Sequence, residues 1–121
     1  MMNKRTTGAA YEKLADAYLT GQGVRIAECN FRVRQGEIDL IGYDGDTLVF
    51  FEVKYRKSAE HGLPQEAVGT KKQLQICRVA QFYRSFRHVP PEKPVRYDVV
   101  AICGSQVTWI KNAFPDLLGG W

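Results

Sequence analysis

Three charged residues in the first half of the chain have the types and spacing of a hydrolytic metal site. Glu52 and Lys54 stand two residues apart in an expected strand, so both side chains point to one face, about 7 Å apart. Asp39 alternates with Ile38 and Leu40 and precedes Glu52 by thirteen residues. A two-residue turn between the strands would place Asp39 opposite either Phe50 or Glu52, and in both registers it shares their face.

Two convergent carboxylates on apolar strands repel each other, and a hard divalent cation relieves that repulsion. Mg²⁺ (or Mn²⁺) held by Asp39 and Glu52 could polarise a scissile phosphate and activate water. Lys54 could orient that water or stabilise the developing charge. The alternative is a cross-strand salt bridge or a solvent-facing Glu-x-Lys pair. Glu37 faces the same side; it could be a ligand or a supporting group, but we interpret it as a polar residue at the start of its strand.

The patterning around these residues predicts an α/β chain with the order α-β-β-β-α-β-β around one mixed sheet, with a helix available on each side. Thr7 and Thr70 are expected helix caps, Asp44-Gly45-Asp46 is a strong hairpin turn signal, and a bulge is expected near residues 27–30. The expected helices are 8–21 and 70–87, and the expected strands are 24–33, 37–43, 47–56, 95–103 and 107–113. A loop is expected at 57–69, a linker at 88–94 and a loose tail at 114–121.

Length and composition indicate one globular domain. The chain has 121 residues, of which 45% are hydrophobic and 25% charged, which excludes wholesale disorder. We expect a single domain, 1–121, with an ordered core over about 8–114. Three widely spaced cysteines, a polar N-terminus and the lack of a long apolar run lead us to expect a cytoplasmic protein with no membrane partner.

The net charge of +4 is concentrated in one segment. Residues 70–96 carry seven basic residues and one acidic residue. This segment could be a solvated helix face, or it could form a nucleic-acid surface. In the second case the expected phosphate-binding residues are Arg56, Lys57, Lys71, Lys72 and Arg78. We assign Phe82, Tyr83 and Phe86 to the core, so recognition of the backbone and shape is expected, rather than of bases.

The order of these motifs resembles a known superfamily. Asp39 followed by Glu52-Val53-Lys54 resembles the D…(D/E)xK core of the restriction-endonuclease-like nucleases. More closely, the chain resembles the YraN-like family of small bacterial proteins, over roughly Gly8 to Phe114. The matching stretches are Gly8-Ala9-Ala10-Tyr11-Glu12, Gly36-Glu37-Ile38-Asp39-Leu40-Ile41, Phe51-Glu52-Val53-Lys54-Tyr55-Arg56, Glu66-Ala67-Val68 and Tyr97-Asp98-Val99-Val100-Ala101.

The resemblance implies a restriction-endonuclease-like three-layer sandwich, similar to archaeal Holliday-junction resolvases, which are metal-dependent homodimers. It implies that Asp39 and Glu52 hold Mg²⁺, that Lys54 assists the attack and that Glu12 supplies another acidic group, although the spacing of Glu12 equally fits a solvated position. The expected function is metal-dependent hydrolysis of branched or structured DNA by a homodimer. The alternative is a non-catalytic nucleic-acid-binding or adaptor protein on a nuclease scaffold.

Overall fold

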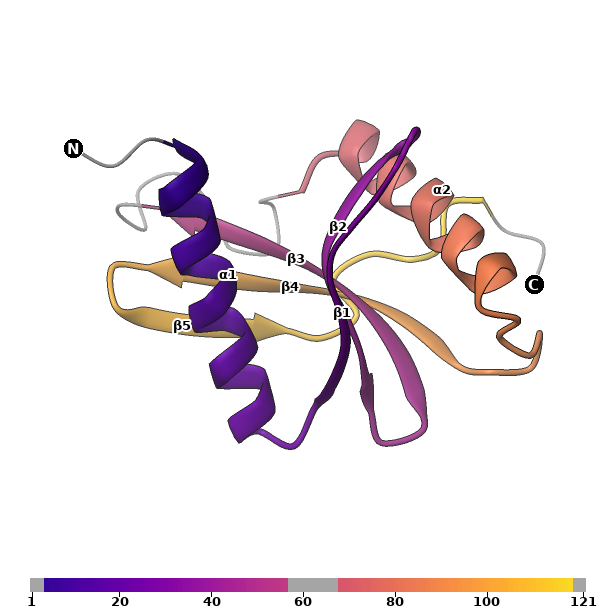
Figure 1. Cartoon of the computed structure of the whole chain (residues 1–121), viewed down its shortest axis with the longest axis horizontal. Helices are drawn as coiled ribbons and strands as arrows, with labels where there is room; N and C mark the ends of the chain where they lie inside the picture. Colours follow the sequence, from indigo (N-terminus) through magenta and orange to yellow (C-terminus); the bar gives the residue numbers. More distant parts are fainter. Residues whose placement is uncertain (1–3, 57–67, 119–121) are drawn as a thin grey trace.

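In the part of the chain that the structure describes, two helices pack on one mixed five-stranded sheet (Figure 1). This computed structural model describes residues 4–56 and 68–118, with side chains from residue 8. The elements are α1 (Lys4–Gly21), β1 (Arg25–Val33), β2 (Gly36–Asp44), β3 (Thr47–Arg56), α2 (Thr70–Phe86), β4 (Val95–Cys103) and β5 (Gln106–Ile110). The expected order α-β-β-β-α-β-β is confirmed.

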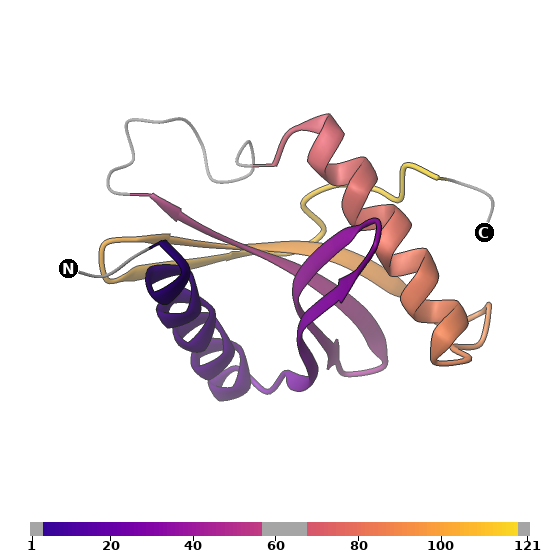
Figure 2. The same cartoon turned by 45° about the horizontal axis from the view of Figure 1, so that its top comes forward.

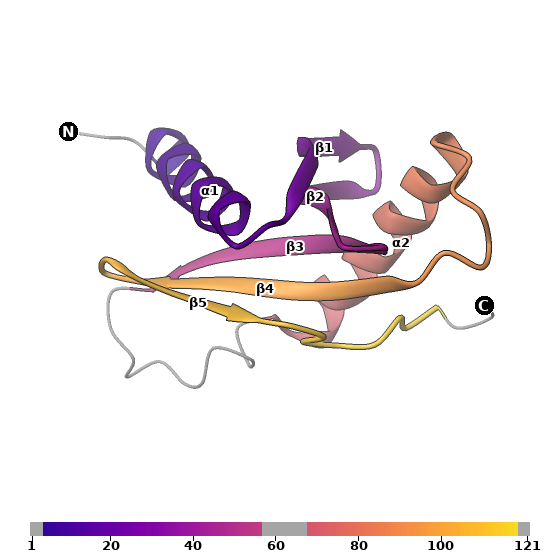
Figure 3. The same ribbon diagram turned by 90° about the horizontal axis from the view of Figure 1, so that it is seen from below.

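The sheet has the strand order β1-β2-β3-β4-β5. The β3–β4 pair is parallel, whereas the three hairpin pairs are antiparallel. A parallel pair needs a crossover connection, and α2 lies on that crossover (Figure 2). The β1–β2 hairpin twists away from the plane of β3, β4 and β5, which Figure 3 shows from below.

Each face of the sheet has its own apolar core, which confirms the three-layer sandwich. Ile76 and Tyr83 of α2 pack with Phe50 in one cluster, and Leu19 of α1 packs with Phe51 in the other. Successive β3 side chains enter opposite clusters, which is why this strand is apolar on both faces. Within the described part of the chain, neither helix is long and apolar enough to cross a membrane.

Several element boundaries differ from the expected ones. α1 begins at Lys4, so Thr7 lies inside the helix and does not cap it. The N-cap of α2 is Gly69, and no side-chain hydrogen bond caps that helix. β5 ends at Ile110 because Asn112 adopts a φ of 55°, and its N–H donates to Asp98 Oδ1 at 2.9 Å. The expected bulge in β1 is confirmed by a register shift between Ile26 and Glu28.

The tail was expected to be loose from Phe114 onward, which is wrong for its described part. Phe114 is buried and its ring stacks on Tyr97, with ring centroids 5.3 Å apart. Leu118 also packs against the α2-side cluster. Aromatic burial therefore holds this segment on the core. Residues 119–121 and most of the expected loop, 57–67, lie outside the described residues.

Candidate functional site

The turn between β2 and β3 sets the register that brings Asp39 to Glu52. The ladder runs from Asp44 paired with Thr47 to Leu40 paired with Phe51, which leaves a two-residue turn of Gly45 and Asp46. Gly45 has a φ of 62°, a conformation that favours glycine in such turns. Continuing this register by one pair places Asp39 opposite Glu52, one of the two arrangements expected from the sequence.

β2 changes face at Asp39. A regular strand would place Ile38 and Leu40 on one side of the sheet, but Ile38 belongs to the α2-side cluster and Leu40 to the α1-side cluster. The expected simple alternation around Asp39 is therefore wrong. Asn30 stands across from this point on β1 and adopts a φ of 54°. The local twist occurs where the β1–β2 hairpin leaves the rest of the sheet. At this point Asp39 can interact both with Glu12 of α1 and with Glu52 of β3.

The Asp39 carboxylate joins two other half-buried carboxylates. Glu12 of α1, Glu37 and Asp39 each offer an oxygen, and these oxygens all lie within 4.8 Å of one another. Burial raises the pKa of Glu12, and the charge of Asp39 raises it further. Glu37, which we had interpreted as a polar strand start, is thus part of the acidic group. Its signal was the two-residue spacing from Asp39, which places both side chains on one face.

Glu52 interacts with Asp39 but lies outside this group of three, and it is 5% exposed. Its Oε2 is 3.7 Å from Lys54 Nζ and 3.8 Å from Lys72 Nζ. Burial raises the pKa of Glu52 to about 8, with a further contribution from the Asp39 charge that the two lysines only partly oppose. Lys72, expected on a nucleic-acid surface, therefore lies beside the Glu52 carboxylate.

These carboxylates fit a hard divalent cation. All the donors are oxygens, which Mg²⁺ and Mn²⁺ prefer. The raised pKa values of Glu12 and Glu52 both include repulsion from Asp39, and a cation would relieve that repulsion. The tight group contains Glu12, Glu37 and Asp39, while Glu52 adjoins it through Asp39. The expected metal ligands were Asp39 and Glu52, with Glu12 as another acidic group; in the structure Glu37 joins Glu12 and Asp39, and Glu52 lies outside this tight group.

A cationic pocket lies between the β1–β2 turn and the first half of α2. It encloses about 620 Å³ and is lined by Gln35, Gly69, Lys71, Lys72, Gln75 and Arg78. Lys71 and Arg78 are exposed, and Lys72 links the pocket to Glu52. Arg56 ends β3 opposite Cys103, away from this pocket's lining, and Lys57 lies outside the described residues. The structure therefore groups three of the five expected phosphate-binding residues.

Two aromatic residues that we assigned to the core are exposed. Phe82 is 43% and Phe86 is 55% exposed, whereas Tyr83 is buried as expected. Tyr83 shares the helix face of Ile76 and Val79, which the sheet covers. Phe82 and Phe86 lie beside that face, with stacked rings whose centroids are 6.1 Å apart. Helical periodicity alone did not show how wide the covered face of α2 is.

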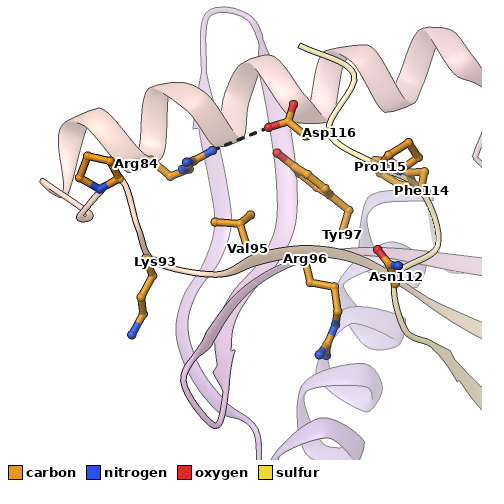
Figure 4. A pocket seen from close by; sticks show the side chains of 10 residues that line it. Arg84, Lys93, Val95, Arg96, Tyr97, Asn112, Phe114, Pro115 and Asp116 are labelled. Atoms are coloured by element: carbon orange, nitrogen blue, oxygen red, sulfur yellow. Dashed lines mark ion pairs between the residues drawn. The ribbon is translucent and has the colours of Figure 1, made fainter. Parts of the chain in front are cut away.

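A second pocket, of about 200 Å³, lies near the start of β4 and includes Arg84, Tyr97 and Asp116 in its lining (Figure 4). Its cations are engaged by carboxylates: Arg84 by Asp116 at 3.8 Å and Arg96 by Asp98 at 2.9 Å. Figure 4 shows Arg96 directed to the opposite side of β4 from the Tyr97 hydroxyl. This pocket therefore offers no group of available cations comparable to the one on α2.

Comparison with known proteins places this fold and these residues in a family. The model of "Uncharacterised protein family UPF0102" matches residues 11–102. A UPF0102 protein of Syntrophus aciditrophicus is 45% identical over 123 residues, covering 98% of this chain and 96% of its own. A UPF0102 protein of Lachnoclostridium phytofermentans is 42% identical over 113 residues, covering 93% and 96% respectively. The chain therefore belongs to the UPF0102 family, the YraN-like family that its motifs resemble.

Proposed function

We propose that this protein is a divalent-metal-dependent endonuclease that hydrolyses phosphodiester bonds in branched or otherwise structured DNA. The observation that carries the proposal is the position of Asp39. Its carboxylate lies with those of Glu12 and Glu37 and also acts on Glu52, which two lysine ammonium groups approach. Acidic ligands beside a cationic group suit metal-assisted phosphodiester hydrolysis, in which a cation activates water and positive charge stabilises the phosphate.

Each residue has a distinct part in this proposal. Glu12, Glu37 and Asp39, together with Glu52, would hold Mg²⁺ or Mn²⁺. A cation bound there would polarise the phosphodiester and lower the pKa of an attacking water. Before metal binds, burial and the charge of Asp39 raise the pKa of Glu52 to about 8, so binding of a cation to its carboxylate would release a proton near neutral pH. The Lys54 ammonium, half-exposed beside Glu52, would stabilise negative charge that builds on the phosphate.

The cationic pocket supports a polyanionic substrate. Lys71 and Arg78 line it, and Lys72 lies between it and Glu52. A phosphate backbone following these side chains would therefore reach the carboxylates. Contacts of this kind give binding that weakens steeply with salt and does not depend on sequence.

The test is a cleavage panel with the full chain. Holliday-junction, flap, single-stranded and duplex DNA are incubated with Mg²⁺, Mn²⁺ or EDTA. We expect metal-dependent cleavage that prefers a branched substrate and is lost in Glu52→Gln. Asp46→Asn is the matched control, because Asp46 is an exposed carboxylate at the turn of the same hairpin. Cleavage that persists in Glu52→Gln would remove the site assignment.

The panel also separates the alternative function. An adaptor on a nuclease scaffold would bind the same DNA with a strong salt dependence but would show no metal-dependent turnover. The two lysines beside Glu52 already balance part of its charge, which is compatible with such a role. Salt-sensitive binding without cleavage in every metal tested would therefore favour the adaptor.

We also propose that the active form is a homodimer, because symmetric cutting of two strands suits a twofold assembly. β1 and β5 are the outer strands of the sheet in the described part of the chain, so either edge is available for pairing. Sedimentation equilibrium with and without junction DNA tests this. A monomer bound to a junction that it still cleaves would contradict the dimer.

A further inference from the structure

One line of side chains along α2 combines cations with exposed aromatic rings. Lys71, Gln75, Arg78, Phe82 and Phe86 are three or four residues apart and therefore share one face of the helix. The first three line the cationic pocket, and the last two are the exposed, stacked phenylalanines. This line, which we call the α2 stripe, spans about 22 Å at 1.5 Å per residue.

The β1–β2 hairpin lies alongside the α2 stripe, and its turn contributes to the lining of the cationic pocket. Gly36 has a φ of 149°, and a Cβ built there would come within 2.7 Å of the Gln75 side chain, so the turn approaches α2 closely. Gln35 from that turn lines the pocket. Further along, Phe31 of β1 lies 6.4 Å from the ring centroids of both Phe82 and Phe86. The cationic and aromatic parts thus follow the same hairpin.

The charge of α2 indicates what binds to the stripe. The exposed side of α2 presents Lys71 and Arg78, with Lys72 beside them, and the helix has no acidic residue. An apolar surface for a protein partner needs no such excess of cations. Cations that follow a phosphate backbone, combined with rings on which bases stack, are the features that bind single-stranded nucleic acid. Phenylalanine rings accept any base, because every base has a stacking face.

We propose that the α2 stripe binds an unpaired DNA strand, with phosphates along Lys71 and Arg78 and one or two bases stacked on Phe82 and Phe86. The choice of DNA rests on the proposed function; the stacking does not. A strand bound in this way would pass Lys72, which lies 3.8 Å from Glu52, as it reaches the carboxylates. The stripe would therefore favour substrates with unpaired nucleotides next to the cleaved bond, such as flaps and open junctions.

The binding is measured by fluorescence anisotropy with a labelled 15-nucleotide oligo-dT and a 15-base-pair duplex, both in EDTA so that nothing is cleaved. The variants are Phe82→Ala, Phe86→Ala and the double variant. Leu14→Ala is the matched control, because Leu14 is an apolar residue of similar exposure, 39%, on α1. We expect the double variant to bind oligo-dT roughly 5- to 100-fold more weakly than the unaltered protein does. Its affinity for the duplex should stay within about twofold of that of the unaltered protein.

Two further variants separate stacking from charge and from folding. Phe82→Trp keeps an aromatic face, so it should retain oligo-dT binding that Phe82→Ala loses. Arg78→Gln should weaken oligo-dT and duplex alike and reduce the slope of affinity against salt by about one. Thermal unfolding of each variant tests whether the fold is intact, and the Phe82→Trp result stands even if an alanine variant proves unstable.

Three outcomes would overturn the proposal. The first is unchanged oligo-dT binding in the double variant, and the second is an equal loss on duplex DNA. The third is tighter binding of oligo-U than of oligo-dT, which would assign the stripe to RNA. Because the measurement is made without metal, a protein that binds oligo-dT through the phenylalanines but cleaves no substrate in either Mg²⁺ or Mn²⁺ would refute the proposed nuclease function and leave the stacking proposal standing.

Discussion

The Asp39 carboxylate accepts a hydrogen bond from the backbone N–H of Val53, with Oδ2 2.8 Å from the nitrogen. The pair of Leu40 and Phe51 is the last one in the β2–β3 ladder, so Asp39 and Val53 lie just beyond the end of the ladder. The side chain of Asp39 thus takes over a backbone donor where the two strands begin to separate. This contact holds the acidic group against β3, so Asp39 has both a structural and a proposed chemical part.

Substitutions at Asp39 separate those two parts. In Asp39→Asn the amide oxygen can still accept from Val53, whereas Asp39→Ala leaves that N–H without its acceptor. We expect Asp39→Ala to lower the free energy of unfolding by about 1 kcal/mol more than Asp39→Asn does, measured by urea titration. Both should lose cleavage by about a hundredfold or more. An asparagine variant that cleaves at the original rate would show that Asp39 acts only structurally.

The raised pKa of Glu52 predicts how the stability of the metal-free protein depends on pH. The ordinary pKa is 4.5, and burial beside Asp39 raises it to about 8. The folded state therefore binds more protons than the unfolded state between these values, so stability falls as pH rises from about 4.5 to about 8. Urea titrations in EDTA should show this decline. Glu52→Gln should flatten it and Asp46→Asn should not; an equal slope in all three would contradict the assignment.

Glu37 is expected to contribute to divalent-cation binding, although from the sequence we interpreted it as a polar residue at the start of its strand. Its carboxylate lies with those of Glu12 and Asp39 and accepts two hydrogen bonds from Arg32, at 2.8 and 2.6 Å. Glu37→Gln should weaken Mn²⁺ binding roughly tenfold or more in isothermal titration calorimetry. Asp46→Asn, an exposed carboxylate on the same hairpin, should bind Mn²⁺ as the unaltered protein does. Equal affinities for Glu37→Gln and the unaltered protein would exclude a role for Glu37.

Asp98 is predicted to stabilise the fold and to have no part in cleavage. Its buried carboxylate accepts hydrogen bonds from Arg96 Nε at 2.9 Å, Trp109 Nε1 at 2.8 Å and the Asn112 N–H at 2.9 Å. Asp98→Ala leaves these donors unsatisfied and removes a partner of the partly buried Arg96. We expect a loss of about 3 kcal/mol in unfolding free energy. At a temperature where the variant remains folded, the cleavage rate should be unchanged; a specific loss of cleavage would place Asp98 in the active site.

The sequence alone was enough to predict the order of the elements. It also predicted that Asp39 lies on one strand and that Glu52 and Lys54 lie on the next. Apolar alternation and the Asp44-Gly45-Asp46 turn are local signals, and if the turn has two residues they limit Asp39 to two registers against β3. The structure has the register with Gly45 and Asp46 as the turn. The family was also recognisable, because its motifs can be read from the sequence without knowledge of the fold, and the family model matches residues 11–102.

Only the tertiary structure decided how the layers meet around these strands. The face change at Asp39 depends on the twist of the β1–β2 hairpin, and the approach of Glu12 to Glu37 and Asp39 depends on how α1 packs beside β2. The exposure of Phe82 and Phe86 depends on how much of α2 the sheet covers. Periodicity specifies the direction of a side chain from its own element, but it does not specify what stands opposite. Twist, crossover and packing between distant segments determine that, and they brought the carboxylates, the lysines and the α2 stripe together.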